Sequence, residues 1–155
     1  MLENKIINVL YVDDEDENLV SFTANYRRYF NIYTALSVRE AHEILSKNYI
    51  HVLITDQRMP ETLGTELLVD AVKKYPNQVR ILLTAYVDAE AIMIAVNNGH
   101  VFKYLLKPWD HEELKNSIIE GYDFYLKNIM KEEIIKNLEL TIKELNSALK
   151  KTALP

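Results

Sequence analysis

The chain has 155 residues, of which 48% are hydrophobic and 26% are charged, values typical of a globular protein with one domain and a short extension. Its net charge of -5 argues against non-specific nucleic-acid binding, and the absence of cysteine excludes disulfides, thiolate metal sites and cysteine nucleophiles. No apolar run is long enough to span a bilayer or to form a signal-peptide core, so we expect a cytoplasmic protein that contacts neither membrane nor nucleic acid directly.

Strand and helix patterns alternate five times along the chain. Short apolar runs rich in β-branched residues predict five strands, at residues 6–12, 32–35, 52–55, 79–83 and 101–106. Apolar residues at steps of three and four predict helices that begin near Asn18, Ser37, Gly64, Asp88 and Asp110. The alternation predicts an α/β fold, with a doubly wound five-stranded parallel sheet flanked by five helices.

Acidic and hydroxyl residues before several helices predict their N-terminal caps. Ser37 and Glu40 have the spacing of a capping box, in which Ser37 accepts from the Glu40 backbone N–H and the Glu40 side chain reaches back to the backbone N–H of Ser37. Asp16 and Glu17 are expected to cap the first helix, and Asp88 the fourth.

The last predicted helix continues beyond the point where a domain would end. Its apolar positions alternate by three and four residues for just over two heptads, at Ile135, Leu138, Ile142, Leu145 and Leu149. The pattern changes phase at the charged residues 131–133, which places a domain over residues 1–130 and a helical coiled-coil linker or dimerisation segment over 131–155. We expect a homodimer through this segment, and a chain that is the N-terminal part of a longer protein.

Polar side chains follow four of the five predicted strands. Asp13 and Asp14 follow the first strand, Asp56 the third, Thr84 the fourth and Lys107 the fifth. The carboxyl ends of parallel strands lie at the same edge of a sheet, where ligands bind. Clustered carboxylates repel one another unless a cation lies among them, and Mg²⁺ prefers such oxygen ligands. The set therefore predicts a magnesium site and phosphoryl transfer to Asp56 as the nucleophile.

The motifs Asp13-Asp14, Asp56-Gln-Arg-Met-Pro60, Thr84-Ala85 and Tyr104-Leu-Leu-Lys107-Pro108 resemble those of the receiver domain of bacterial two-component response regulators, over about residues 5–130. The resemblance implies a flavodoxin-like receiver fold. It also implies a phosphoacceptor signalling module that takes a phosphoryl group from a partner histidine kinase or phosphotransfer protein, and that is not an enzyme.

The same resemblance implies a role for each motif residue. Asp13, Asp14, Asp56 and the backbone carbonyl of Arg58 would bind Mg²⁺. Lys107 would pair with the phosphoryl oxygens, and its peptide bond to Pro108 would be cis.

Thr84, Ala85 and Tyr104 correspond to the phosphate-binding switch of this family. On phosphorylation the Thr84 hydroxyl would move to the phosphoryl group and the Tyr104 ring would turn inward, which changes the neighbouring surface. Arg58 and Tyr86 occupy positions associated with the lifetime of the phosphoryl group. The sequence Asp-Gln-Arg-Met-Pro, with Lys-Pro-Trp109, resembles a subgroup often coupled to enzymatic or second-messenger output domains.

Two other functions stay open. An aspartate-nucleophile phosphohydrolase of the dehalogenase type would share Asp56 and Mg²⁺, but such enzymes usually carry a second acid two residues later, where this chain has Arg58. The other open function is a scaffold that binds partners without phosphorylation. The intact set of polar residues at the strand ends argues against it. The histidines are scattered without metal-site spacing and are predicted to be surface or loop residues, at His42, His51, His100 and His111.

Overall fold

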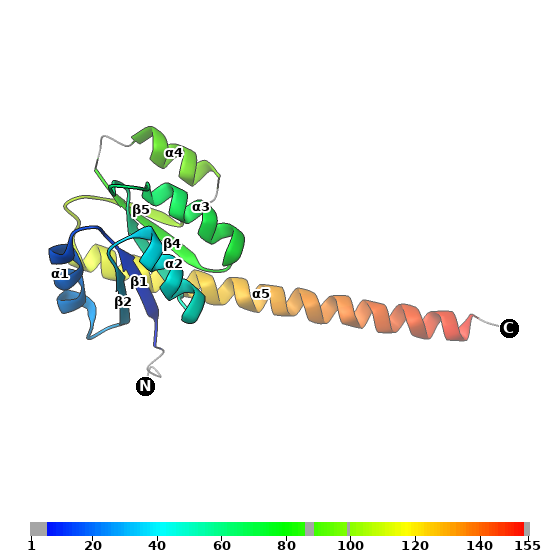
Figure 1. The fold of residues 1–155 in the computed structure, drawn as a ribbon. Helices are drawn as coiled ribbons and strands as arrows, with labels where there is room; N and C mark the ends of the chain where they lie inside the picture. Colours follow the sequence, from blue (N-terminus) through cyan, green and yellow to red (C-terminus); the bar gives the residue numbers. More distant parts are fainter. Residues whose placement is uncertain (1–5, 86–88, 99, 154–155) are drawn as a thin grey trace. The chain divides into compact units, whose positions relative to one another are not determined.

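The computed structural model describes residues 6–85, 89–98 and 100–153. Five parallel strands form one sheet in the order β2-β1-β3-β4-β5 (Figure 1). The strands are β1 (Asn8–Val12), β2 (Asn31–Ala35), β3 (Val52–Asp56), β4 (Val79–Thr84) and β5 (Lys103–Leu106). The helices are α1 (Asp16–Tyr26), α2 (Val38–Lys47), α3 (Gly64–Lys74), α4 (Ala89–Asn97) and α5 (His111–Thr152). The predicted doubly wound α/β fold is confirmed.

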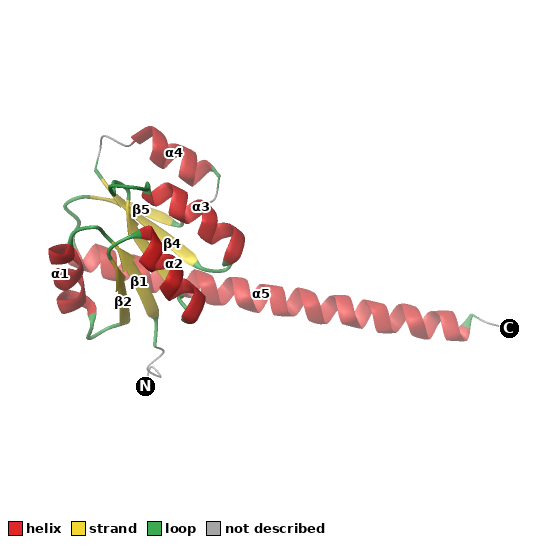
Figure 2. Cartoon of the chain, in the orientation of Figure 1, coloured by secondary structure: helices red, strands yellow, loops and turns green. Residues whose placement is uncertain are grey.

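Two layers of helices cover the sheet. Helices α2, α3 and α4 lie over one face, and α1 lies over the other face together with the first turns of α5 (Figure 2). Successive side chains of a strand point to opposite faces, so β1 contributes to both cores. Leu10 packs in the core that includes residues of α2, α3 and α4. Tyr11 packs on the α1 side, where its ring centroid lies 4.5 Å from that of Phe22.

The strand order reverses beside β1, because the chain passes from β1 out to β2 and then returns across β1 to β3. Val12 of β1 pairs with Thr55 of β3, so the residues that follow these two positions are neighbours. The reversal opens a crevice at the carboxyl ends of β1 and β3, the usual ligand position in open α/β sheets.

Helix α2 begins with the predicted serine cap. The Ser37 hydroxyl accepts a hydrogen bond from the Glu40 backbone N–H at 3.1 Å. The Glu40 carboxylate accepts from the backbone N–H of Leu36 at 2.8 Å, one residue before the position expected for a capping box. The prediction that the Glu40 side chain binds the backbone N–H of Ser37 was therefore wrong. The carboxylate instead holds Leu36, in the connection between β2 and α2.

Helix α5 is capped by Asp110, whose Oδ1 accepts from the backbone N–H groups of Glu112 and Glu113 at 2.8 and 3.0 Å. The expected cap of α4 at Asp88 lies outside the described residues. The capping prediction for Asp16 and Glu17 was wrong, because both residues lie within the first turn of α1.

His51 lies just before β3 and is partly buried, which the sequence interpretation of the histidines as surface or loop residues missed. Its Nδ1 accepts from the backbone N–H of Asn8 at 2.9 Å. Its ring packs against those of Tyr49, Tyr122 and Tyr125, with centroid distances of 5.1, 5.1 and 5.2 Å. Burial lowers the pKa of His51, so the neutral ring is favoured in this cluster.

The chain consists of two compact units, Met1–Tyr125 and Leu126–Pro155. The first contains the sheet and its helices. In the second, residues 130–153 are all exposed in the single chain. Among the described residues, no helix has both the length and the apolar character that a membrane crossing requires. The division into a domain over 1–130 and a coil over 131–155 stays a prediction.

Candidate functional site

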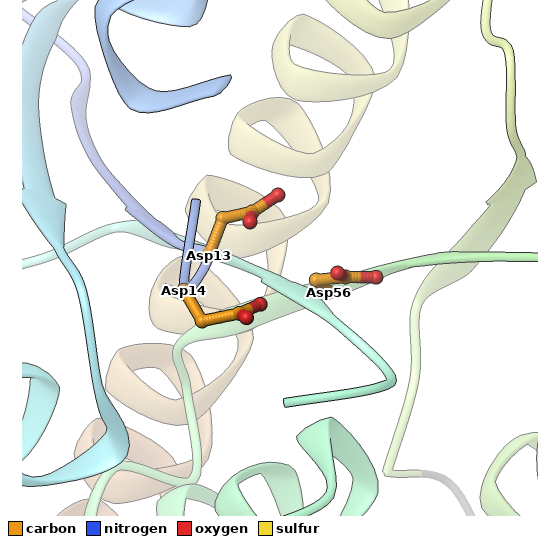
Figure 3. A group of neighbouring side chains, drawn as sticks. All are labelled: Asp13, Asp14 and Asp56. Atoms are coloured by element: carbon orange, nitrogen blue, oxygen red, sulfur yellow. The ribbon is translucent and has the colours of Figure 1, made fainter. Parts of the chain in front are cut away.

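Three carboxylates meet at the carboxyl ends of β1 and β3. Asp13 and Asp14 directly follow β1, and Asp56 is the last residue of β3. Each offers one oxygen that lies within 4.8 Å of the others (Figure 3). Asp13 is fully buried, whereas Asp14 and Asp56 are partly exposed. The group is therefore open to solvent on the side of Asp14 and Asp56.

Asp13 is held in place by hydrogen bonds from residues close to it in the sequence. Its Oδ2 accepts from the Tyr11 hydroxyl at 2.6 Å and from Asn18 Nδ2 at 3.0 Å, and its Oδ1 accepts from the Glu15 backbone N–H at 2.9 Å. A buried charge is tolerated only with such partners. Burial, with Asp13 beside it, raises the pKa of Tyr11 far above its usual value, so the phenol stays a donor.

Neither Tyr11 nor Asn18 was identified from the sequence as part of the site. For Tyr11 a signal existed, because it stands two residues before Asp13 in an extended segment, and alternate residues of a strand face the same way. The contact between Asn18 and Asp13 depends on the residue at which α1 begins. The apolar pattern of the first predicted strand does not determine that residue.

Lys107 supplies the positive charge of the site. Its Nζ lies 2.9 Å from Asp56 Oδ1 and 3.9 Å from Asp13 Oδ2. Its backbone N–H donates to the Thr84 carbonyl at 2.9 Å, which fixes the start of the loop after β5 against the end of β4. The Lys107–Pro108 peptide bond is cis, as the resemblance implied.

The charges at the site do not balance within the protein. Three carboxylates face one ammonium group, so two negative charges are left over when all four groups are ionised. Burial raises the pKa of Asp56, and the contact with Lys107 offsets part of that rise. A second positive charge would favour ionised Asp56 further, and oxygen ligands of this kind suit a hard divalent cation such as Mg²⁺.

The loop after Asp56 is fixed by Gln57, a buried residue whose role the sequence did not reveal. The Gln57 backbone N–H donates to the Leu83 carbonyl at 3.1 Å, and its own carbonyl accepts from the Gly64 N–H at 2.8 Å. Its side-chain oxygen accepts from the Thr65 N–H at 2.9 Å. Gly64 packs so closely that an added Cβ would overlap the backbone carbonyl oxygen of Asp56. Helix α3 therefore begins directly against the site.

The remaining predicted site residues lie around this centre. Thr84 ends β4 and is buried, and its hydroxyl donates to the Ala85 carbonyl at 3.2 Å. Tyr104 of β5 is 45% exposed and lines a groove of about 360 Å³ together with apolar residues of α4. Arg58 is exposed in the loop after β3, and the metal-binding role of its carbonyl stays a prediction. Tyr86 lies outside the described residues.

The family model described as "Response regulator receiver domain" matches residues 9–119. The hydrogenase transcriptional regulatory protein HoxA of Cupriavidus necator is 32% identical over 122 residues, which are 79% of this chain and 25% of that protein. The chain thus spans about a quarter of the length of the curated relatives it matches first.

Two solved structures show the same architecture at higher coverage. A structure described as adenylate cyclase from Rhodopirellula baltica matches with a TM-score of 0.82 and 34% identity, over 84% of this chain and 98% of that one. The signal receiver domain of an HD domain-containing protein from Pseudomonas fluorescens Pf-5 matches with a TM-score of 0.75 and 26% identity, over 79% of this chain and 99% of that one.

Proposed function

This chain belongs to the response regulator receiver domain family, and from that premise we propose that Asp56 accepts a phosphoryl group from a partner histidine kinase or phosphotransfer protein. The observation that carries the proposal is the 2.9 Å contact between Asp56 Oδ1 and Lys107 Nζ, within a cluster of three carboxylates. Receiver domains are signalling modules, and we propose that this one acts as a phosphoacceptor and not as an enzyme.

The transfer needs a nucleophile and positive charge in fixed positions, which this site supplies. A carboxylate oxygen of Asp56 forms a bond to phosphorus as the phosphorus–nitrogen bond of the phosphohistidine breaks, and the imidazole nitrogen keeps the electron pair. The Lys107 ammonium group lies where it can pair with a phosphoryl oxygen as Asp56 becomes phosphorylated. The hydrogen bonds of Gln57 hold the backbone that directly follows the reacting carboxylate.

We propose that Asp13, Asp14, Asp56 and the Arg58 carbonyl hold Mg²⁺. The donor set fits this ion, because the carboxylate oxygens are hard ligands, lie close together and carry more negative charge than Lys107 neutralises. When bound, the ion would neutralise charge on the carboxylates and on the incoming phosphoryl group.

We further propose that Thr84 and Tyr104 form the switch. In the structure the Thr84 hydroxyl is bound to the carbonyl of its neighbour Ala85, and the Tyr104 ring is half exposed beside the groove of α4. Both observations support a state before phosphorylation. A phosphoryl group on Asp56 would attract the hydroxyl and release space for the ring, and the surface of α4 and β5 would change.

For the output we propose a class of protein module that the receiver controls. The names of similar proteins include a transcriptional regulatory protein, an adenylate cyclase and an HD domain-containing protein. These names support a receiver that controls a separate output module, as expected for the subgroup with the Asp-Gln-Arg-Met-Pro and Lys-Pro-Trp sequences. A homodimer through residues 131–155 completes the proposal.

Labelling with a small phosphodonor tests the acceptor. The chain is incubated with acetyl phosphate and Mg²⁺, and the intact mass is measured before and after brief alkaline treatment. We expect one base-labile phosphoryl group that is absent in Asp56→Asn and after chelation of Mg²⁺. It should be retained in the control Asp70→Asn, which changes a half-exposed aspartate of α3.

Two outcomes would contradict the proposal. Labelling that persists unchanged in Asp56→Asn would place the acceptor elsewhere. Continuous hydrolysis of the donor, many turnovers for each chain and abolished by Asp56→Asn, would instead identify the aspartate-nucleophile phosphohydrolase.

A further inference from the structure

The second unit carries a row of apolar side chains on an exposed helix. Ile135, Leu138, Ile142, Leu145 and Leu149 are each between 44% and 65% exposed in the single chain. These five residues are the seam. Most of the stability of a helix in a protein comes from burying its apolar face, so an exposed helix of this length needs a partner along the seam.

The residue types of the seam indicate which partner. With Ile135 at an a position of the heptad, the a positions are isoleucine, isoleucine and leucine, and both d positions are leucine. In parallel coiled coils, isoleucine at a with leucine at d favours two strands over three or four. Lysine recurs every seven residues on the outer face, at Lys136, Lys143 and Lys150. We propose that the second unit pairs in parallel, and in register, with the second unit of another copy of this chain.

The residues beside the seam favour the parallel arrangement. In a parallel pair, each g residue faces the e residue of the next heptad on the partner. Ile134 would then face Glu139, and Thr141 would face Asn146, so no like charges meet. In an antiparallel pair the e positions face one another, and the alignment that packs Leu138 against Ile142 of the second copy also brings Glu139 against Glu139 of that copy.

The proposal deepens the homodimer of the proposed function and is independent of phosphorylation. The seam is short, so we expect a dimer that dissociates on dilution. Covalent trapping suits such a dimer, and the chain contains no cysteine, so an introduced cysteine can pair only with its copy.

Cysteine trapping of the intact chain distinguishes the arrangements. Lys131→Cys and Thr152→Cys each introduce a cysteine at a d position, one at either end of the seam and outside its apolar core. Lys143→Cys places a cysteine on the outer face as a control. We expect disulfide dimers from each of the two end variants alone, at a level well above that of the control.

Every other result overturns the proposal. Dimers that form only when the two end variants are mixed would show an antiparallel pair. No dimer above the control level would show that a second copy does not cover the seam. Asp56→Asn, added to either end variant, should leave the trapping unchanged, so that failure of the phosphoacceptor and failure of the coil are distinguishable.

A matched pair of substitutions tests the seam itself. Leu138 and Leu140 are 57% and 50% exposed in the single chain and stand two residues apart on one helix. Leu138→Ser should raise the dissociation constant of the dimer by about tenfold or more in sedimentation experiments, because Leu138 is a d residue. Leu140→Ser should change it by less than about twofold, because Leu140 faces outward. Equal effects would overturn the assignment of the seam.

Discussion

Replacing Tyr11 with phenylalanine removes one hydroxyl group and tests whether Asp13 is a buried charge held by the protein. The hydroxyl lies 2.6 Å from Asp13 Oδ2, and Asp13 is fully buried. The ring can keep its contact with Phe22. We expect the free energy of unfolding to fall by about 1.5–3 kcal/mol, the range for a hydrogen bond to a charged group, because burial prevents bulk water from replacing the donor.

Tyr26→Phe is the matched control. Tyr26 is also a buried tyrosine of the aromatic cluster beside α1, and its hydroxyl donates to the neutral backbone carbonyl of His111 at 3.1 Å. Its loss should cost about 0.5–1.5 kcal/mol, the usual net value for a neutral hydrogen bond. Urea denaturation of both variants at neutral pH gives the two values. If Tyr11→Phe costs no more than Tyr26→Phe, Asp13 does not depend on the tyrosine as a charged partner.

Two further predictions concern the loop after β3 and the histidine before it. Gly64→Ala should lower the free energy of unfolding by about 1–3 kcal/mol and slow the labelling of Asp56 by the phosphodonor, because the new Cβ would overlap the Asp56 carbonyl oxygen. An unchanged urea midpoint and an unchanged labelling rate would show that the loop adapts. Because burial lowers the pKa of His51, the unfolded chain binds more protons below the ordinary histidine pKa, and stability should fall as the pH drops below about 6.5. His51→Gln, which keeps an acceptor for the Asn8 N–H, should lose less stability between about pH 7 and about pH 5.5, and equal losses in thermal unfolding would contradict the role of His51.

The sheet and the centre of the site could be predicted because both depend on order along the chain. Five alternations of strand and helix leave few arrangements other than a doubly wound parallel sheet. In such a sheet the carboxyl end of every strand lies at the same edge, so Asp13, Asp56 and Lys107 were expected at one edge although Lys107 is 94 positions after Asp13. In the structure Lys107 Nζ lies 2.9 Å from Asp56 Oδ1 and 3.9 Å from Asp13 Oδ2.

The supporting contacts could not be predicted, because they depend on local angles and on packing between distant segments. Glu40 has the right spacing for a capping box, yet its carboxylate reaches Leu36, a choice set by the path of the chain before α2. The role of Gln57 depends on how closely α3 approaches β3. His51 is enclosed by Tyr122 and Tyr125, which α5 brings from the far end of the first unit.

The hydrogen bonds of Asp13 give it a different role from that of Asp14 and Asp56. A carboxylate has about four lone-pair sites, and Asp13 already uses three of them to accept hydrogen bonds from Tyr11, Asn18 and the Glu15 N–H. Lys107 Nζ also lies close to Oδ2, the oxygen that accepts from Tyr11 and Asn18. Within the proposed Mg²⁺ site, direct ligation would therefore fall mainly to Asp14, Asp56 and the Arg58 carbonyl, and Asp13 would help to hold the ion chiefly through its charge. Asp13 would act as a stationary charge, so a cation could enter and leave the site without any rearrangement of the strand end that defines it.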